Sequence, residues 1–309
     1  MKNFLVPTDF SSEAHHAYEV ALQLAHHAGG TVTLLHVLED MEEAGGGFST
    51  LGSTLGGPGI DAIYPIKLME ATKRRLRGLM VEAAEVAGDV PVQEAIKTGP
   101  VGAGILKAIQ RFNTDLVVMG ARSDGATAHF FVSSTTERMI RLAPCPVLTV
   151  KHRHVPFAVK NVVFPSDFTD EAVQAVGPLR DVLAAFPKAK LHLLHVLGGR
   201  DSFAAQERMK AFAEHAQLPA AQMAEPNAKS TTAGIEQYAQ EVQADLVVIP
   251  THVRSGLSSF FRTSIAEAVA THAFPRCSPT TSPTPTRPCP QARRQQHTPT
   301  GCFRSGLVG

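Results

Sequence analysis

Residues 4–10 read Phe-Leu-Val-Pro-Thr-Asp-Phe, and residues 162–168 read Val-Val-Phe-Pro-Ser-Asp-Phe. In both places a short apolar run ends at a proline, and a hydroxyl residue, an aspartate and a phenylalanine follow. A run that is apolar at consecutive positions and stops at turn-forming residues is typical of a buried parallel strand. The stretch therefore predicts a strand and a following turn that occur twice in the chain.

Three further landmarks recur in the same order. The run Leu-Leu-His-Val-Leu at residues 34–38 returns at 193–197, and Asp-Leu-Val-Val at 115–118 returns at 245–248. Ser134 corresponds to Ser264. Because the repeated unit is as long as a domain, the pattern indicates a duplication and excludes a solenoid of short repeats.

Apolar runs alternate with helical patterns in the first half. The expected strands are Asn3–Val6, Thr31–Val37, Val92–Ile96, Leu116–Met119 and Val147–Val150. A first helix should be capped by Ser11 or Ser12 and end at Gly29-Gly30. A longer helix should follow Pro65, with an inward stripe at Leu68, Leu76, Leu79 and Met80. Two more are expected over Val101–Phe112 and Ser134–Leu142. This alternation predicts an α/β fold with a doubly wound, mainly parallel, five-stranded sheet in each half.

The repeat also sets the expected domain boundaries. We expect a first domain at 1–152, a linker at 153–160, a second domain at 161–274 and a tail at 275–309. The second domain follows the first up to Thr271-His272-Ala273 and then departs from it, so its last strand is expected to be missing.

The tail has a composition of its own. Seven of its 35 residues are proline, and apolar periodicity is almost absent, which is typical of disordered segments. One hypothesis is a shift of reading frame near codon 274, because codons for Pro-Arg-Cys-Ser-Pro-Thr can spell a strand-like Pro-Val-Leu-Thr-Tyr in another register. The alternative is a genuine disordered tail.

Charge and cysteine content narrow the function classes. Leaving out the five arginines of the tail, the body has 24 basic and 28 acidic residues, and the chain has no tryptophan. Such a body is poorly suited to phosphate backbones or stacked bases, so no nucleic-acid partner is expected. No apolar run is long enough to cross a bilayer and no signal peptide is recognised, which predicts a cytoplasmic protein without a membrane partner. The cysteines fit no zinc pattern.

Taken together, the motifs Pro-Thr-Asp-Phe-Ser at 7–11, Leu-His-Val at 35–37, Asp-Leu-Val-Val-Met-Gly at 115–120 and Ala-Pro-Cys-Pro-Val-Leu at 143–148 resemble the universal stress protein (UspA) family. The resemblance covers residues 1–273 and both halves. It implies two tandem domains with the adenine nucleotide α hydrolase-like fold and a role in stress response. It also implies that fifth strands pair across a dimer interface, either between the two domains of one chain or in a homodimer.

The family divides by nucleotide binding, and its ATP-binding members carry Gly-x₂-Gly-x₉-Gly-Ser/Thr after strand four. The first half keeps Gly120 but has Ser123 and Ser133 at the other two glycine positions. Bare glycine lets the backbone approach phosphates and aim its N–H groups at them. Each forced replacement costs about 1–3 kcal/mol, so two cost about 2–6 kcal/mol, or one and a half to four decades of affinity.

The resemblance assigns candidate nucleotide contacts by position. In the first domain they are Thr8, Asp9, Val37, Met119, Gly120, Ser123, Ser133 and Ser134. Their counterparts in the second domain, expected to be inactive, are Asp167, Val196, Pro250, Val253, Thr263 and Ser264. The alternative for Asp9 and Asp167 is that each caps the following helix or braces the turn.

No catalytic constellation is found in the sequence. The nucleophile elbow, the zinc-protease motif and the dinucleotide fingerprint are all missing, and the glycine-rich segment 45–59 lacks the ending of a P-loop. His15 and His26 share a helix face but lie about 16 Å apart along its axis, too far for one metal ion. His36 and His195 are interpreted as satisfied core residues.

The expected function is therefore stress response by non-catalytic binding, with no metal, no cofactor and an unidentified protein partner. The alternative is an ATP-binding sensor that works through the first domain, with slow hydrolysis as an option.

Overall fold

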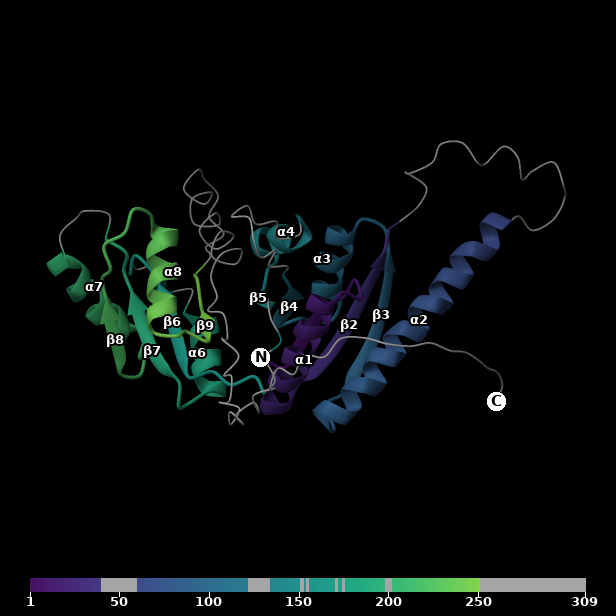
Figure 1. Cartoon of the computed structure of the whole chain (residues 1–309), viewed down its shortest axis with the longest axis horizontal. Coiled ribbons are helices and arrows are strands. Elements are labelled where there is room, and N and C mark those ends of the chain that lie inside the picture. The colour runs from purple at the N-terminus through teal and green to yellow at the C-terminus, as the bar shows by residue number, and fades with distance from the viewer. Residues whose placement is uncertain are drawn as a thin grey trace, which may run out of the picture. The chain divides into compact units, whose positions relative to one another are not determined.

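The structure is a computed structural model of the whole chain, and it describes residues 1–39, 60–121, 134–150, 153, 156–169, 172–173, 176–197 and 202–250. Two parallel sheets are present, one in each half of the sequence (Figure 1). This confirms the predicted α/β fold with tandem sheets.

The first sheet has the strand order β3-β2-β1-β4-β5, and every pair is parallel. Its strands are β1 (Asn3–Pro7), β2 (Thr31–Leu38), β3 (Val92–Thr98), β4 (Leu116–Gly120) and β5 (Val147–Val150). The chain reverses its direction of winding at β1, so the carboxyl ends of β1 and β4 lie side by side at the switch point of a doubly wound sheet. All five predicted strands are found, each within two residues of its predicted ends.

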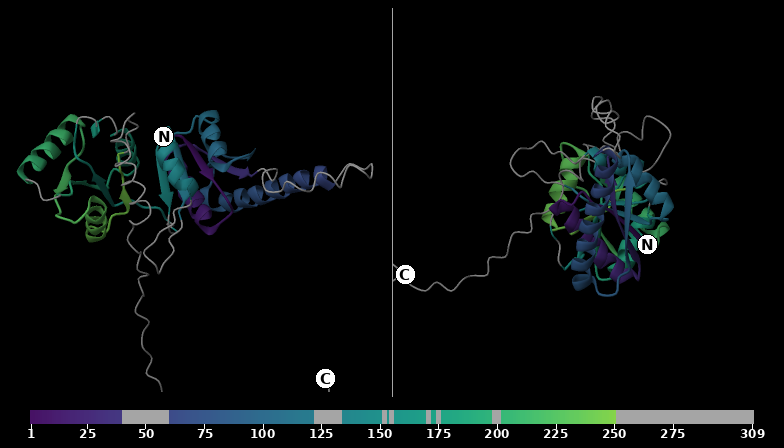
Figure 2. Two further views of the ribbon diagram at one scale, coloured as in Figure 1. Left: turned by 90° about the horizontal axis from the view of Figure 1, so that it is seen from above. Right: turned by 90° about the vertical axis from the view of Figure 1, so that its right-hand side faces the viewer.

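Helices cover both faces of this sheet (Figure 2). On one face, α1 (Ser12–Ala28) and α2 (Ile60–Ala87) enclose a core that contains Val6, Val32 and Val118. On the other face, α3 (Val101–Arg111) and α4 (Ser134–Leu142) pack on Leu5, Leu35 and Val117. Because neighbouring side chains of a strand point to opposite faces, the continuous apolar runs of the sequence fill both cores.

The ends of α1 follow the local sequence. The hydroxyl of Ser11 accepts a hydrogen bond from the backbone N–H of Ala14, and Gly29 ends the helix in the left-handed conformation at φ 60°. Both were predicted, because serine is a favoured N-cap and glycine adopts positive φ without a steric penalty.

The predicted start of the second helix was wrong. It begins at Ile60, so Pro65 lies inside it instead of before it. Pro65 is the sixth residue of the helix, where its fixed φ is helical and its ring costs the one main-chain hydrogen bond that its N–H would donate. Of the predicted inward stripe, Leu76 is fully buried, whereas Leu68, Leu79 and Met80 are partly buried.

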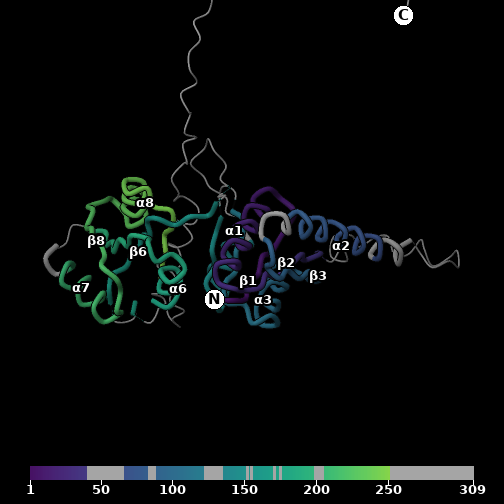
Figure 3. Tube along the Cα trace, turned by 90° about the horizontal axis from the view of Figure 1, so that it is seen from below, coloured from purple at the N-terminus to yellow at the C-terminus, as the bar shows by residue number. Residues whose placement is uncertain are grey.

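The second sheet has the order β8-β7-β6-β9 and is also parallel throughout. Its strands are β6 (Asn161–Pro165), β7 (Lys190–Leu194), β8 (Ala221–Ala224) and β9 (Leu246–Val247). Helices α6 (Gly177–Ala185) and α7 (Ser202–His215) lie on one face and α8 (Thr231–Glu241) on the other (Figure 3). The described residues of this half thus hold four strands, with none in the place that β5 takes in the first sheet.

Some predictions fall outside the described residues. These are the glycine-rich segment 45–59, the helix expected at 264–272 and the tail 275–309. Within the described ranges, no helix is both long and apolar enough to span a bilayer, and no cluster of three or more His, Cys, Asp or Glu side chains could hold a metal ion.

One buried titratable group distinguishes the second sheet from the first. His192 on β7 is 3% exposed, its Nδ1 lies 3.0 Å from the hydroxyl of Tyr238, and its Nε2 has no hydrogen-bond partner. Desolvation, and secondarily the charge of Lys190, lower the pKa of His192 below its ordinary value of 6.5. The corresponding position of the first sheet is Thr33, which is also buried.

We therefore expect the second domain to lose stability in mild acid. As the pH falls below about 6.5, the unfolded chain takes up a proton that the folded His192 does not accept, so the free energy of unfolding falls until the folded pKa is passed. The urea midpoint of the second domain should drop more between pH 7.5 and 5.5 in the native chain than in His192→Thr. Equal drops in the two proteins would contradict this expectation.

Candidate functional site

The candidate site lies where three strands of the first sheet end. Thr8 and Asp9 follow β1, Val37 lies near the end of β2, and Met119 and Gly120 close β4. Parallel strands bring their carboxyl ends to one edge of the sheet, which is where α/β folds bind ligands. Five of the eight residues assigned from the sequence therefore share one edge.

The turn after β1 is held by a second segment of the chain. The Nδ1 of His36 lies 2.7 Å from the carbonyl oxygen of Thr8, and the backbone N–H of Phe10 donates to the hydroxyl of Thr8 at 3.0 Å. A carbonyl can only accept, so Nδ1 carries the proton in this contact, and Nε2 of a neutral His36 is then an acceptor. Thr8 is buried and both of its oxygens are engaged within the turn.

The second half repeats this arrangement. The Nδ1 of His195 lies 3.0 Å from the carbonyl oxygen of Ser166, whose hydroxyl accepts from the N–H of Phe168 at 3.0 Å. His36 and His195 are therefore hydrogen-bonded, as interpreted from the sequence, although both are only partly buried. Their role as braces of the first turn was not predicted. The signal was available, because each histidine recurs at the same place in both repeats.

The contacts of His36 with Thr8 and of His195 with Ser166 support an unusual backbone conformation in the turn. Phe10 has a φ of 65° and Phe168 a φ of 56°, in the left-handed region that side chains with a Cβ rarely adopt. The Phe10 ring lies against His36, with ring centroids 4.7 Å apart, and the guanidinium of Arg75 lies 4.1 Å from its centroid. The turn is thus fixed by hydrogen bonds and ring contacts together.

The two aspartates take part in local contacts. The Oδ1 of Asp9 accepts a hydrogen bond from the N–H of Ser11 at 2.9 Å, and the hydroxyl of Thr169 donates to Oδ1 of Asp167 at 3.3 Å. This geometry agrees with the bracing alternative for both residues. The helix cap itself is made by Ser11, so Asp9 acts on the turn that precedes α1.

Gly120 is held against the start of α1. A Cβ built on Gly120 would overlap the backbone of Glu13 and lie 2.6 Å from the nitrogen of Ala14. Its φ is not in the left-handed region, unlike those of Gly29, Gly88 and Gly99. The lack of a side chain at this position is thus explained by close packing of β4 against α1, without reference to a ligand.

Val37 is engaged in packing as well. A Cβ on Gly104 of α3 would lie 2.9 Å from one methyl carbon of Val37, and Gly234 of α8 stands in the same relation to Val196 at 2.5 Å. Each glycine lets a helix sit directly on a valine at the end of the second strand. The structure describes Asp167, Val196 and Pro250 in the second half, whereas Ser123, Ser133, Val253, Thr263 and Ser264 lie outside the described residues. Ser134 is the first residue of α4.

The opposite edge of each sheet carries a matched aspartate. The Oδ2 of Asp115 accepts from the N–H groups of Lys2 and Asn3 at 2.6 and 3.0 Å, and Oδ2 of Asp245 accepts from those of Lys160 and Asn161 at 2.7 and 2.9 Å. These two hydrogen bonds lower the pKa of Asp115 below its ordinary value. The aspartate of the repeated Asp-Leu-Val-Val run is therefore a structural link between neighbouring strands.

Comparison with known proteins agrees with the duplicated fold. The sequence profile of the universal stress protein family matches residues 1–151 and again residues 158–274. A universal stress protein of Thermus aquaticus is 31% identical over 151 residues, which are 48% of this chain and 98% of that protein. One of Staphylococcus haemolyticus is 27% identical over 156 residues, 50% of this chain and 87% of that protein.

A solved structure matches over both halves. The universal stress protein from Archaeoglobus fulgidus superposes with a TM-score of 0.66 at 19% identity, covering 88% of this chain and 95% of that one. At this level of identity the likeness concerns the fold. The two profile matches and this structure describe the same tandem arrangement.

Proposed function

The chain belongs to the universal stress protein family, and on that premise we propose that it serves in stress response by binding, without catalysis and without a bound nucleotide in either domain. The observation that carries the proposal is the packing of Gly120 against α1. Of the three glycine positions of the motif in each half, only that of Gly120 still holds glycine. The close approach of α1 explains why this position has no side chain, and the explanation does not involve a phosphate.

The other motif positions support the same proposal. Ser123 and Ser133 carry side chains where backbone N–H groups would have to meet phosphate, and Pro250 has no N–H at all. Thr8 and Asp9 already use their oxygens in the turn after β1. These contacts give both residues a role in the turn that requires no nucleotide.

The alternative is an ATP-binding sensor that acts through the first domain, with slow hydrolysis as an option. It is favoured by the unbroken spacing of Gly120, Ser123, Ser133 and Ser134, and by the position of Thr8, Asp9 and Val37 at one edge of the sheet. Serine hydroxyls could donate some of the hydrogen bonds that the glycine backbone provides in the motif.

A thermal-shift experiment separates the two readings. A ligand at about 100 times its Kd adds roughly 2.7 kcal/mol, which raises the melting temperature of a domain of this size by several degrees. We expect 1 mM ATP with Mg²⁺ to leave the melting temperature of the native chain unchanged and to raise that of Ser123→Gly/Ser133→Gly. The matched control is Val253→Gly/Thr263→Gly, in which Pro250 still blocks the second domain.

A shift in the native chain itself would favour the sensor. Mass spectrometry of the purified protein under non-denaturing conditions gives an independent readout, because stoichiometric adenine nucleotide on the native chain would contradict binding without nucleotide. We further propose that the protein is cytoplasmic and that its two domains, or two chains, pair with each other. Its binding target in this proposal is a protein, and neither nucleic acid nor a membrane is a partner.

A further inference from the structure

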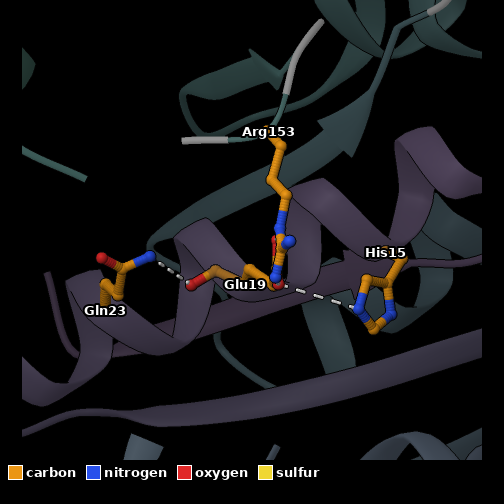
Figure 4. Close-up of polar contacts among 4 residues, drawn as sticks. All are labelled: His15, Glu19, Gln23 and Arg153. Carbon is orange, nitrogen blue, oxygen red and sulfur yellow. Dashed lines mark hydrogen bonds and ion pairs between the residues drawn. The ribbon is translucent and has the colours of Figure 1, made fainter. Parts of the chain in front are cut away.

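Helix α1 buries a carboxylate near its middle. The side chain of Glu19 is 7% exposed, and a buried ionised carboxylate lowers stability unless it is paired. Arg153 provides the pairing, with Nη2 at 2.8 Å from Oε1 and Nε at 3.2 and 3.1 Å from the two oxygens (Figure 4). His15 lies further away, with its Nε2 3.9 Å from Oε1.

The second repeat shows that the fold does not need this carboxylate. Counted forward from Phe10 and Phe168, the position of Glu19 is Gly177, and counted back from β2 and β7 it is Pro178. Neither residue carries a charge. Helix α6 begins at Gly177 and has no acidic side chain at either position, so we attribute the presence of Glu19 to its partner Arg153 and not to the helix.

The linker makes a second contact one turn further along α1. The side-chain amide nitrogen of Gln23 donates to the backbone carbonyl oxygen of Glu19 at 3.1 Å (Figure 4), and its Oε1 contacts the linker. That oxygen accepts from the backbone N–H of Phe157 at 2.6 Å. Glu19 and Gln23 lie four residues apart and therefore share one face of the helix.

We propose that Glu19 and Gln23 form a docking surface on α1 for the chain's own interdomain linker, and that they fix the linker to the first domain. The Glu19–Arg153 ion pair and the Gln23–Phe157 hydrogen bond together are called the linker latch. This inference concerns the coupling of the two domains and goes beyond the proposed function.

The latch shortens the free connection between the domains. Ten residues separate β5 from β6, and fully extended they could span about 35 Å. Phe157 is held on α1, Val159 is buried in the core of the second half, and the N–H of Lys160 donates to Asp245. Only Ala158 remains between the anchors, and the path from Phe157 to Lys160 is at most about 11 Å. Releasing the latch would roughly triple the available reach.

Trypsin tests the latch on the full-length protein. To cut the bond after Arg153, the protease must take that side chain into its specificity pocket, and the ion pair with Glu19 competes with this although the Arg153 side chain is 65% exposed. We expect Glu19→Leu to be cut after Arg153 about tenfold faster than the native chain, because the folded state no longer holds the guanidinium. Glu207→Gln, which removes the exposed ion pair with Lys210, is the matched control and should be cut at the native rate.

Melting temperatures show that release of the linker is not general unfolding. Glu19→Leu should keep nearly the native melting temperature of the first domain, since an apolar side chain can replace a buried carboxylate and its ion pair with little net loss, and Arg153 is already 65% exposed. Arg153→Gln should lower it, because an unpaired carboxylate stays buried, and Glu19→Leu/Arg153→Gln should restore it. Should Glu19→Leu fail to fold, Glu19→Gln gives the same cleavage readout. Native cleavage rates in a folded Glu19→Leu or Glu19→Gln protein would overturn the proposal.

Discussion

Gly120→Ala should destabilise the first domain by about 3 kcal/mol, at the upper end of the range for overpacked positions. The added methyl group would meet backbone atoms of Glu13 and Ala14, which cannot move aside by changing a rotamer. Either α1 or β4 must then shift. Both elements contribute side chains to the same core of the first domain, so a shift of either one disturbs its packing. The free energy of unfolding from urea titration in the absence of nucleotide measures the effect.

The control for this prediction is Gly78→Ala. Gly78 lies in α2, and a Cβ there would have open space around it. Alanine favours helix over glycine by about 0.5–1 kcal/mol, so this variant should be slightly more stable than the native chain. If Gly120→Ala unfolded at the native urea concentration, the packing explanation for this glycine would be wrong. The proposal of a domain without nucleotide would then lose its main support.

Phe164→Ala should remove most of the stability of the second domain while leaving the first intact. Phe164 is fully buried in β6 and packs against Phe212 and Phe168, with ring centroids 5.7 and 6.4 Å away. Deleting a buried phenylalanine side chain costs about 3–5 kcal/mol, a large share of the roughly 5–15 kcal/mol that stabilise a domain. Calorimetry should show the transition of the second domain lost or strongly shifted to low temperature.

The matched variant is Val6→Ala at the equivalent position of β1. Val6 is also fully buried, and its truncation should cost about 2 kcal/mol in the first domain only. The two variants should therefore move different transitions. A single transition that responds equally to both would show that the domains unfold as one cooperative unit, contrary to the prediction.

The sequence predicted the strands because they are set by local patterns. Most of the runs are largely apolar and end at turn residues, so the strands expected at Thr31–Val37 and Val147–Val150 could be predicted without knowing their neighbours. The start of α2 could not, because the sequence signal at Pro65 conflicts with a helix that begins at Ile60. Proline is an ambiguous signal near the first turns of a helix.

The candidate site was predicted in position more than in role. The sequence motifs assigned Thr8, Asp9, Val37, Met119 and Gly120 as candidate contacts. All five lie at one edge of the first sheet, as the strand order requires. The sequence did not show that His36 holds the carbonyl of Thr8, because that contact joins residues 28 positions apart. It also assigned Gly120 to a phosphate-binding motif, whereas its neighbours in space are backbone atoms of α1.

The sequence by itself determined that two similar α/β domains follow one another, because the same local patterns of apolar and turn residues occur twice in the same order. Only the tertiary structure decided why Gly120 must be glycine, what His36 braces and that Glu19 meets Arg153 across 134 residues of chain. Periodicity records which face of an element is buried, but it carries no information on which distant segment lies against that face.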